Sequence, residues 1–303
     1  MENTGFIFDT KKFAINDGPG IRTTIFFKGC SLNCQWCHNP ESISAKPQKM
    51  FNINKCITCG ECVTACQSDA ISLATGKIVF DNELCNLSGA CAEACPTGAI
   101  EMVGRTATVA ELMEIIEKDR IFYDQSEGGV TFSGGEVLLQ PNFLIELLDT
   151  CKKEHIHRTL DTTGNVASDI LLEVAKRVDL FLYDLKMIDC EKHQKYCGVS
   201  NTLILDNLKK LSKQGAHIII RIPFINGVNS DDVNIEATAK FVAALEGEKK
   251  LVNLLPFHKV AEKKSERLGK HCDLSKMAEP TPEELSHAVS IFAKHGVTAK
   301  IGG

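Results

Sequence analysis

The sequence has no long apolar segment and no concentration of positive charge. No apolar run reaches the ~18–20 residues that span a bilayer, and residues 1–5 lack the basic start and apolar stretch of a signal peptide. The net charge is −5 and the basic residues are dispersed, so no surface for a phosphate backbone is expected. We therefore expect a cytoplasmic protein that binds neither a membrane nor nucleic acid.

Cysteine, by contrast, is plentiful, with 14 residues in a chain of 303. Cytoplasmic thiols are kept reduced, so metal binding explains these residues better than disulfides do. The length suits one main domain with an insert, and a hydrophobic content of 44% is ample for a core.

Three cysteines follow the apolar run at residues 24–27. Cys30, Cys34 and Cys37 have the spacing C-x3-C-x2-C. A four-iron cluster needs one ligand per iron and a structural zinc takes four donors, so three thiolates leave one metal position free for a non-protein ligand. The alternatives are a zinc loop completed by His38 and three thiols that bind no metal.

This loop resembles the signature loop of the radical S-adenosylmethionine (SAM) enzymes. The flanking segments, DGPGIR at residues 17–22 and HNPES at residues 38–42, narrow the resemblance to the activating enzymes of glycyl-radical enzymes. The resemblance implies that the open iron chelates SAM, and that one electron from the reduced cluster cleaves SAM to methionine and a 5′-deoxyadenosyl radical. This radical would take a hydrogen from a glycine of a partner glycyl-radical enzyme. An electron donor such as flavodoxin or ferredoxin and an anaerobic setting are also implied.

A second group of cysteines lies between residues 50 and 103. Its first run has the C-x2-C-x2-C-x3-C spacing of bacterial ferredoxins, and a related run that ends in Cys-Pro follows. In two-cluster ferredoxins the fourth cysteine of each run binds the other cluster. We therefore assign the ligands of one cluster as Cys56, Cys59, Cys62 and Cys95.

The other cluster of this segment keeps only three thiols, from Cys66, Cys85 and Cys91, because Ser88 stands where the second run should have a cysteine. Its fourth ligand is then the Ser88 hydroxyl or another group, or the cluster holds three irons. The alternative for the whole segment is a pair of zinc knuckles.

Beyond residue 103 the apolar pattern alternates between helical and strand-like spacing. A helix is expected at residues 108–118 with Thr108 as its N-cap. Later segments of the two kinds take turns at residues 129–132, 142–153, 158–161, 169–176, 180–184, 202–214, 218–223, 232–245, 251–255, 282–295 and 298–301. This alternation predicts an α/β fold with a parallel sheet and crossover helices.

With the strand expected at residues 23–27, six or seven strands are visible, too few for a closed eight-stranded barrel. The resemblance implies an open, partial (β/α)6 TIM-type barrel formed by residues 1–49 and 104–303. A ferredoxin-like insert, residues 50–103, would follow the first strand after a linker at residues 44–50.

Active sites of parallel sheets lie beyond the C-terminal ends of the strands, so the polar residues there are the candidates. Gly134, Gly135 and Glu136 follow the second expected strand. They resemble the GGE motif of the family, whose backbone and acidic side chain meet the amino group of SAM. The alternative is a tight turn with no ligand.

The other strand ends carry charged residues whose roles come from the same resemblance. Asp161 would face the SAM ribose or a bound monovalent cation shared with Glu136; capping of the next helix is the alternative. Asp184 and Lys186 end the fourth strand, and Lys186 would reach the SAM carboxylate unless it is only a solvated lysine. Arg221 would also pair with a SAM carboxylate, unless an internal salt bridge holds it.

The remaining implied contacts lie outside these strand ends. His258 would lie near the methionyl end of SAM, although a lone histidine is usually structural. Trp36 and His38 would lie against the adenine. Asp17 is the expected contact for the partner's glycine loop, and a β-turn is the alternative for its segment.

Four cysteines fit no ligand spacing, namely Cys151, Cys190, Cys197 and Cys272. We interpret them as ordinary core or surface residues. Two other functions compete with the activating enzyme: a radical SAM enzyme that modifies a small molecule directly, and an electron-transfer protein built on the residue 50–103 segment.

Overall fold

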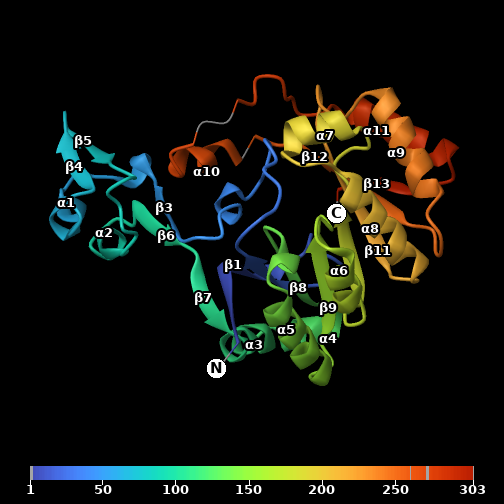
Figure 1. Cartoon of the computed structure of the whole chain (residues 1–303), viewed down its shortest axis with the longest axis horizontal. Helices are drawn as coiled ribbons and strands as arrows, with labels where there is room; N and C mark the ends of the chain where they lie inside the picture. Colours follow the sequence, from blue (N-terminus) through green and yellow to red (C-terminus); the bar gives the residue numbers. More distant parts are fainter. Residues whose placement is uncertain (1–2, 260, 271–272, 303) are drawn as a thin grey trace.

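The computed structural model describes residues 3–259, 261–270 and 273–302. Its main sheet has nine strands, β1 (Thr4–Ala14), β2 (Arg22–Phe27), β7 (Arg105–Thr108), β8 (Gly129–Gly134), β9 (His157–Thr162), β10 (Leu180–Asp184), β11 (Ile218–Phe224), β12 (Leu251–Pro256) and β13 (Ala299–Ile301). They lie in the order β13-β12-β11-β10-β9-β8-β2-β1-β7. Because the sheet ends at β13 on one side and β7 on the other, it is open (Figure 1).

The seven strands from β2 to β13 in this order pair in parallel, whereas β1 is antiparallel to both β2 and β7. The parallel sheet that the alternating pattern predicts is therefore confirmed. The antiparallel edge is a finding that the sequence pattern did not indicate. As a consequence, the cysteine-rich segment follows the second strand of the chain and not the first, which corrects the expectation.

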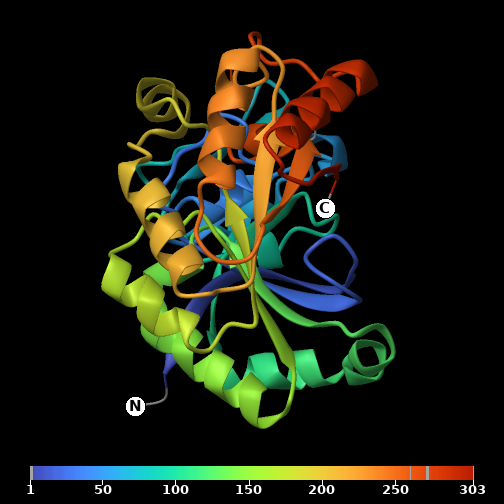
Figure 2. The same ribbon diagram turned by 90° about the vertical axis from the view of Figure 1, so that its right-hand side faces the viewer.

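Helices connect the strands along one face of the curved sheet (Figure 2). They are α3 (Val109–Glu117), α4 (Arg120–Ser126), α5 (Pro141–Lys153), α6 (Ser168–Ala175), α7 (Cys190–Cys197), α8 (Thr202–Lys213), α9 (Asp232–Ala243) and α11 (Pro282–Lys294), with a 3-10 turn η3 (Val137–Leu139). Helix α10 (Ala261–Arg267) lies apart from this face (Figure 1). The core between helices and sheet is apolar and fully buried, as at Phe132, Leu160 and Ile220. No described helix is long and apolar enough to cross a membrane.

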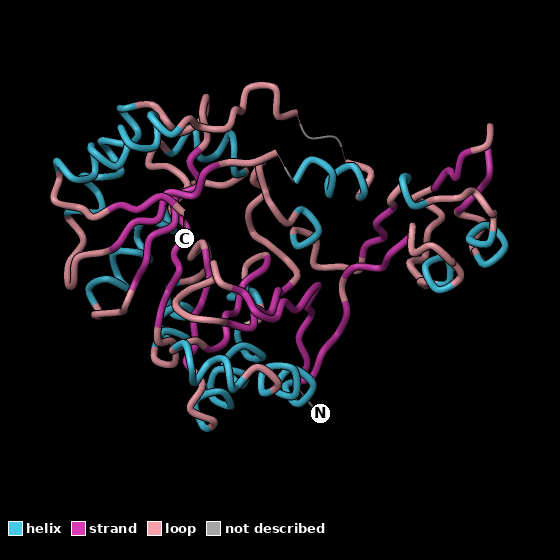
Figure 3. Tube along the Cα trace, turned by 180° about the vertical axis from the view of Figure 1, so that it is seen from behind, coloured by secondary structure: helices cyan, strands magenta, loops and turns pink. Residues whose placement is uncertain are grey.

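The segment between β2 and β7 forms a small body at one end of the molecule (Figures 1 and 3). Its elements are β3 (Gln48–Phe51), η2 (Ile53–Lys55), α1 (Glu61–Ala65), β4 (Ile71–Ala74), β5 (Lys77–Phe80), α2 (Ala90–Glu93) and β6 (Ile100–Val103). The 3-10 turn η1 (Pro40–Ser42) precedes it. Strands β3 and β6 pair antiparallel and form the stalk of this body. The linker expected at residues 44–50 is wrong for Gln48–Met50, which belong to β3.

The internal repeat of this segment is visible in its backbone. Gly60 and Gly89 precede α1 and α2, with φ angles of 83° and 86°. Only glycine adopts this left-handed conformation without strain, so the same turn starts both short helices. The two cysteine runs are thus two copies of one local structure.

Helix α3 begins at the predicted N-cap. The Thr108 hydroxyl accepts the Glu111 N–H at 3.1 Å, and the Glu111 carboxylate accepts the Thr108 N–H at 2.7 Å. This capping box satisfies two backbone donors that have no partner within the helix.

We predict that Thr108→Ala lowers the free energy of unfolding by about 1 kcal/mol, because the Glu111 N–H loses its acceptor. Denaturant titration of both proteins measures the difference. Thr106→Ala, on the exposed part of β7, is the control and is expected to change stability little. Equal stability of Thr108→Ala and the unaltered protein would contradict the capping role.

Candidate functional site

The loop that carries the first three cysteines is held by backbone hydrogen bonds. It leaves β2 at residue 28, where the Gly29 N–H donates to the Ser42 carbonyl at 2.7 Å and the Cys30 N–H to the Ile43 carbonyl at 3.1 Å. The Cys37 N–H then donates to the Cys34 carbonyl at 3.1 Å and closes a turn. The loop is therefore folded back on itself between β2 and η1.

The C-terminal end of α7 holds the middle of the same loop. The carbonyls of Tyr196 and Cys197 accept the N–H groups of Gln35 and Asn33 at 3.0 and 2.9 Å. Helix ends have free carbonyls, so α7 can bind the loop without breaking its own hydrogen bonds. The Cys197 thiol is fully buried and hydrogen-bonded to that of Cys34.

Cys197 is thus a contact that sequence reasoning missed. As a residue it is in the core, as predicted, but it also touches a cysteine of the loop. No spacing rule relates Cys34 to Cys197, so only the fold could reveal the pair. Of the other unassigned cysteines, Cys151 is buried and Cys190 is exposed, and Cys272 lies outside the described residues.

The glycine pair after β8 lies against this loop. Gly135 donates its N–H to the Phe27 carbonyl at 2.9 Å, and Glu136 donates to the Gly29 carbonyl at 2.7 Å. A Cβ atom at Gly134 would overlap the Phe27 carbonyl oxygen, and one at Gly135 would overlap that of Gly29. The missing side chains therefore let the two backbones approach.

Glu136 is fully buried, and protein groups occupy both of its carboxylate oxygens. One accepts the Thr162 hydroxyl at 2.7 Å, and the other accepts the hydroxyl and N–H of Thr163 at 2.6 and 3.0 Å. Burial raises the pKa of Glu136, and the bonds from Thr162 and Thr163 oppose this shift. Its side chain joins the ends of β8 and β9.

A cleft of about 360 Å³ lies beyond the C-terminal ends of the parallel strands. This volume is in the range of small-molecule sites. The structure brings twelve of the predicted residues to its walls, namely Asp17, Cys30, Cys34, Trp36, Cys37, His38, Gly134, Gly135, Asp161, Asp184, Lys186 and Arg221. Of the residues predicted to hold SAM and its cluster, two do not line the cleft, namely Glu136 and His258.

His258 follows β12, but its side chain is 59% exposed and its Nδ1 atom lies 3.7 Å from a Glu279 carboxylate oxygen. Its neighbours Pro256 and Phe257 line the cleft instead. Asp17 lines the cleft and is already bonded, since its carboxylate accepts the Thr24 hydroxyl at 2.7 Å. The strand β2 thus orients the segment of residues 17–20.

Asp161 and Arg221 form an ion pair across the cleft floor. The Arg221 Nη1 atom lies 3.5 Å from Asp161 Oδ2, which also accepts the Ser133 hydroxyl at 2.7 Å. Burial raises the pKa of Asp161 to about 6, although Arg221 opposes the shift. Asp161 Oδ1 and Arg221 Nε are both buried and without a hydrogen-bond partner, so each retains capacity for a ligand.

A second pair, Asp184 and Lys186, lies on the neighbouring strand end. The ammonium is 2.5 Å from the carboxylate, and the Lys186 side chain is only 11% exposed. Burial lowers the pKa of Lys186, but Asp184 and the nearby Cys34 outweigh it and raise the pKa overall. Lys186 therefore carries a positive charge beside the cysteine loop.

The three thiols are partly buried in the walls of the cleft. Burial raises the pKa of Cys30 and of Cys37 to about 12. The pKa of Cys34 is also raised, first by its hydrogen bond with Cys197 and then by burial. Metal binding would displace these protons, because the thiolate is the ligand. Partial desolvation of the ring and then the charge of Lys186 lower the pKa of His38.

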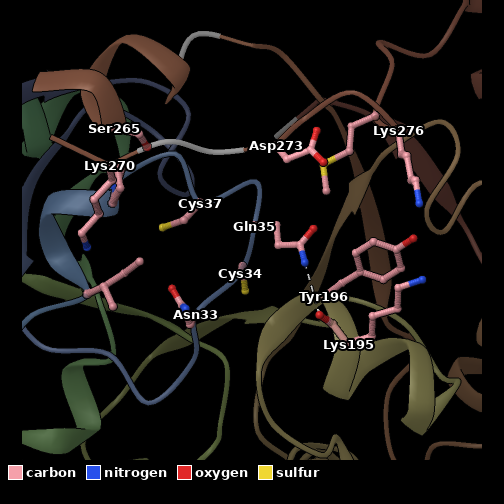
Figure 4. Close-up of a pocket in the computed structure, with 13 residues that line it drawn as sticks. Asn33, Cys34, Gln35, Cys37, Lys195, Tyr196, Ser265, Lys270, Asp273 and Lys276 are labelled. Atoms are coloured by element: carbon pink, nitrogen blue, oxygen red, sulfur yellow. Dashed lines mark hydrogen bonds between the residues drawn. The ribbon is translucent and has the colours of Figure 1, made fainter. Parts of the chain in front are cut away.

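Cys34 and Cys37 also line a second cavity, of about 680 Å³, on the outer side of the loop. Figure 4 shows these residues between Tyr196 of α7 and Lys270, with the Gln35 amide donating to the Lys195 carbonyl at 3.3 Å. The cysteine loop therefore lies between two cavities, and Cys34 and Cys37 line both of them.

The ten thiols that the sequence marks as metal ligands fall into three groups. Besides the loop, one hollow in the small body is lined by Cys56, Cys59, Cys62 and Cys95, and another by Cys66, Cys85, Cys91 and Ser88. In two-cluster ferredoxins the fourth cysteine of each run binds the other cluster, and this rule gives the same two groups of cysteines. No three His, Cys, Asp or Glu side chains of the described chain are placed to hold a single metal ion.

The raised pKa of Asp161 predicts a pH dependence of stability. Between about pH 3.8 and about pH 6 the folded protein binds this proton and the unfolded chain does not, so the free energy of unfolding falls as pH rises. The total change is about 3 kcal/mol, most of it lost by pH 6.

Asp161→Asn removes this titration. We expect the stability of the variant, relative to the unaltered protein, to rise from pH 4 to pH 6 and stay constant above, as measured by denaturant titration at each pH. Asp169→Asn, at an exposed position in α6, is the control. A relative stability of Asp161→Asn that does not change with pH would contradict the shift.

Comparison with known proteins identifies the family of this site. Residues 24–241 match the Radical SAM superfamily. The trans-4-hydroxy-L-proline dehydratase activating enzyme of Clostridioides difficile is 44% identical over 98% of this chain and 99% of its own length. The choline trimethylamine-lyase activating enzyme of Oleidesulfovibrio alaskensis is 40% identical over 89% of this chain and 88% of its own length.

A solved structure is also similar. A domain of pyruvate-formate lyase-activating enzyme from Bacteroides vulgatus is 39% identical and superposes with a TM-score of 0.51, covering 58% of this chain and 99% of that domain. The predicted resemblance is confirmed: this chain belongs to the radical SAM superfamily and, within it, to the activating enzymes of glycyl-radical enzymes.

Proposed function

We propose that this oxidoreductase reductively cleaves SAM in the cleft and generates a glycyl radical on a partner glycyl-radical enzyme. One observation supports this above others: the three thiols of the signature loop, Cys30 to Cys37, line the same cleft as the charged pairs at the strand ends. An iron–sulfur cluster bound there would supply the electron that cleaves SAM to methionine and a 5′-deoxyadenosyl radical. The chain's own residues bind and orient what that chemistry needs.

The cleft fits a ligand with both charges, such as the amino-acid end of SAM. Lys186 and the unpartnered Arg221 Nε would hold a carboxylate, because each cation has N–H donors beyond those used by its acidic partner in the cleft. Asp184 and the backbone of Gly134 and Gly135 would meet the amino group. Trp36 and His38 line the cleft and would contact the adenine.

The buried and unpartnered Asp161 Oδ1 would meet the SAM ribose or a monovalent cation, since a hydroxyl or a cation satisfies such an oxygen. Glu136 takes a different role from the expected one. With both oxygens bonded to the end of β9, it would position the Gly134–Gly135 turn and not touch SAM itself. His258 would contact the methionyl end only after its exposed side chain turns inward.

We also propose that residues 50–103 are a ferredoxin-like insert on an open, partial (β/α)6 barrel, and that the insert holds two iron–sulfur clusters. The hollow lined by Cys56, Cys59, Cys62 and Cys95 offers four thiols. The other hollow offers three thiols and Ser88. The buried Lys49 ammonium lines this hollow and has no hydrogen-bond partner. Burial raises the pKa of Cys91 and the Lys49 charge opposes the shift, so this lysine would favour an anionic cluster.

The proposed partners follow from this assignment. A flavodoxin or ferredoxin would supply the electron, and the glycine loop of a glycyl-radical enzyme would meet the Asp17 segment at the cleft. The relatives named above activate a dehydratase and a lyase, so we propose a partner among such enzymes. Thiol-bound clusters need a reducing compartment, so we propose that the protein acts in the cytoplasm.

The proposed function predicts that replacing Cys30, Cys34 and Cys37 by alanine abolishes 5′-deoxyadenosine formation while the insert clusters persist. Liquid chromatography measures the product, and electron paramagnetic resonance (EPR) measures the clusters. Cys190→Ala, at an exposed cysteine outside the site, is the control and should retain activity. Undiminished SAM cleavage in the triple variant would show that the cleavage site lies elsewhere.

A second prediction concerns the incomplete ligand set. A serine hydroxyl binds iron less well than a thiolate, so the cluster beside Ser88 should be labile or hold three irons. Ser88→Cys should give a more stable four-iron centre, observed by EPR and by iron content after gel filtration. Ser68→Cys places a thiol at another position of the same hollow and is the matched control. Four sulfur ligands at this cluster in the unaltered protein would refute the assignment.

The third prediction tests the function itself. Reduced protein, SAM and a candidate glycyl-radical enzyme, mixed without oxygen, should give a glycyl EPR signal on the partner. Mutation of the partner's radical glycine should remove the signal. SAM cleavage without a partner radical, but with consumption of a small molecule, would instead favour direct modification of a small molecule.

A further inference from the structure

Helix α10 lies between the main sheet and the small body formed by residues 48–103 (Figure 1). It has two cationic side chains that contact two different segments. Lys264 contacts the end of the signature loop, and Arg267 contacts β6 of the small body. A single turn of helix thus touches both parts of the molecule that are expected to hold clusters.

The Lys264 ammonium contacts the chain just after Cys37. It lies 2.6 Å from Glu41 Oε1 and donates to Asn39 Oδ1 at 2.8 Å. The Glu41 side chain is only 7% exposed, and its second oxygen is buried without a hydrogen-bond partner. A buried carboxylate is costly unless a cation compensates it, so Lys264 stabilises the loop end in this position.

The Arg267 guanidinium lies 2.6 Å from Glu101 Oε2 on β6. The other Glu101 oxygen lies 3.6 Å from the ammonium of Lys55, the residue before Cys56. Arg267 and Glu101 are 27% and 43% exposed, so the pair adds little to global stability. The Arg267–Glu101 ion pair instead fixes the position of β6, and with it the stalk, relative to α10.

A second connection ties the other strand of the stalk to the same loop end. The buried Lys28 donates to the Glu41 carbonyl and, at 2.8 Å, to Gln48 Oε1. Gln48 is the first residue of β3, which pairs with β6. Residues 39–41 are therefore joined to β3 through Lys28 and to β6 through α10.

We propose that α10 is a clamp that fixes the insert relative to the signature loop, and that Lys264 and Arg267 are positioning residues for electron delivery between them. The inference rests on the proposed function, because it takes the insert as the electron relay. Clusters held by the insert cysteines would accept one electron from a flavodoxin or ferredoxin and pass it to a cluster held by Cys30, Cys34 and Cys37. Two groups that exchange an electron must be held close together, and the contacts of α10 and of Lys28 hold the β3–β6 stalk against the end of the signature loop.

Charge reversal of the exposed pair tests the clamp with little risk to folding. Arg267→Glu and Glu101→Arg should each increase hydrogen–deuterium exchange in β3 and β6. Each should also slow SAM cleavage several-fold with reduced flavodoxin as donor. With dithionite, a small reductant that does not need the relay, cleavage should be unchanged. The double variant restores the opposite charges and should recover both properties.

Lys263→Glu is the matched control, since it reverses an exposed charge on the same helix. Lys264→Met, in the buried contact, should increase exchange at residues 39–43 as well. Normal exchange and normal flavodoxin-driven cleavage in both single variants, or no recovery in the double variant, would overturn the clamp. Absence of dithionite-driven cleavage in the unaltered protein would instead overturn the proposed function and leave the exchange result standing.

Discussion

The site depends on the close contact of two backbones, those of the signature loop and of the turn after β8. The hydrogen bonds from Gly135 and Glu136 to Phe27 and Gly29 are short because no Cβ atom stands between the chains. Glu136 then extends this contact to β9 through Thr162 and Thr163. The loop, β8 and β9 are therefore one rigid unit, and the buried charges gather around it.

The charged pairs of the cleft are arranged for a ligand more than for stability. Asp184 and Arg221 are register partners on β10 and β11, and Asp161 lies one strand further along. Two acids and two bases are thus buried within three neighbouring strand ends. Desolvation of such groups costs about as much as their pairing returns, so apolar residues would serve the fold equally well. A ligand that carries a positive and a negative group would satisfy the unpartnered Asp161 Oδ1 and Arg221 Nε atoms.

The sequence predicted the parallel strands well because their apolar pattern is strong. It missed β1, whose exposed residues alternate irregularly with buried ones, and α7, in which only His193 and Cys197 are buried. The strand-end residues could be predicted to converge, since parallel strands end at one edge of a sheet. The inward bonding of Glu136 and the exposure of His258 could not, because both depend on contacts between loops distant in sequence.

Backbone hydrogen bonds hold the path of the signature loop. Its hydrogen bonds to Ser42, Ile43 and α7, and from the glycine turn, all join backbone atoms, so they do not depend on the thiols. Burial raises the pKa of Cys30 and of Cys37, so metal binding at these thiols would release protons. A loop fixed in this way can form a wall between two cavities. The same rigidity explains why its far end, at Glu41, is a suitable anchor for the stalk of the insert.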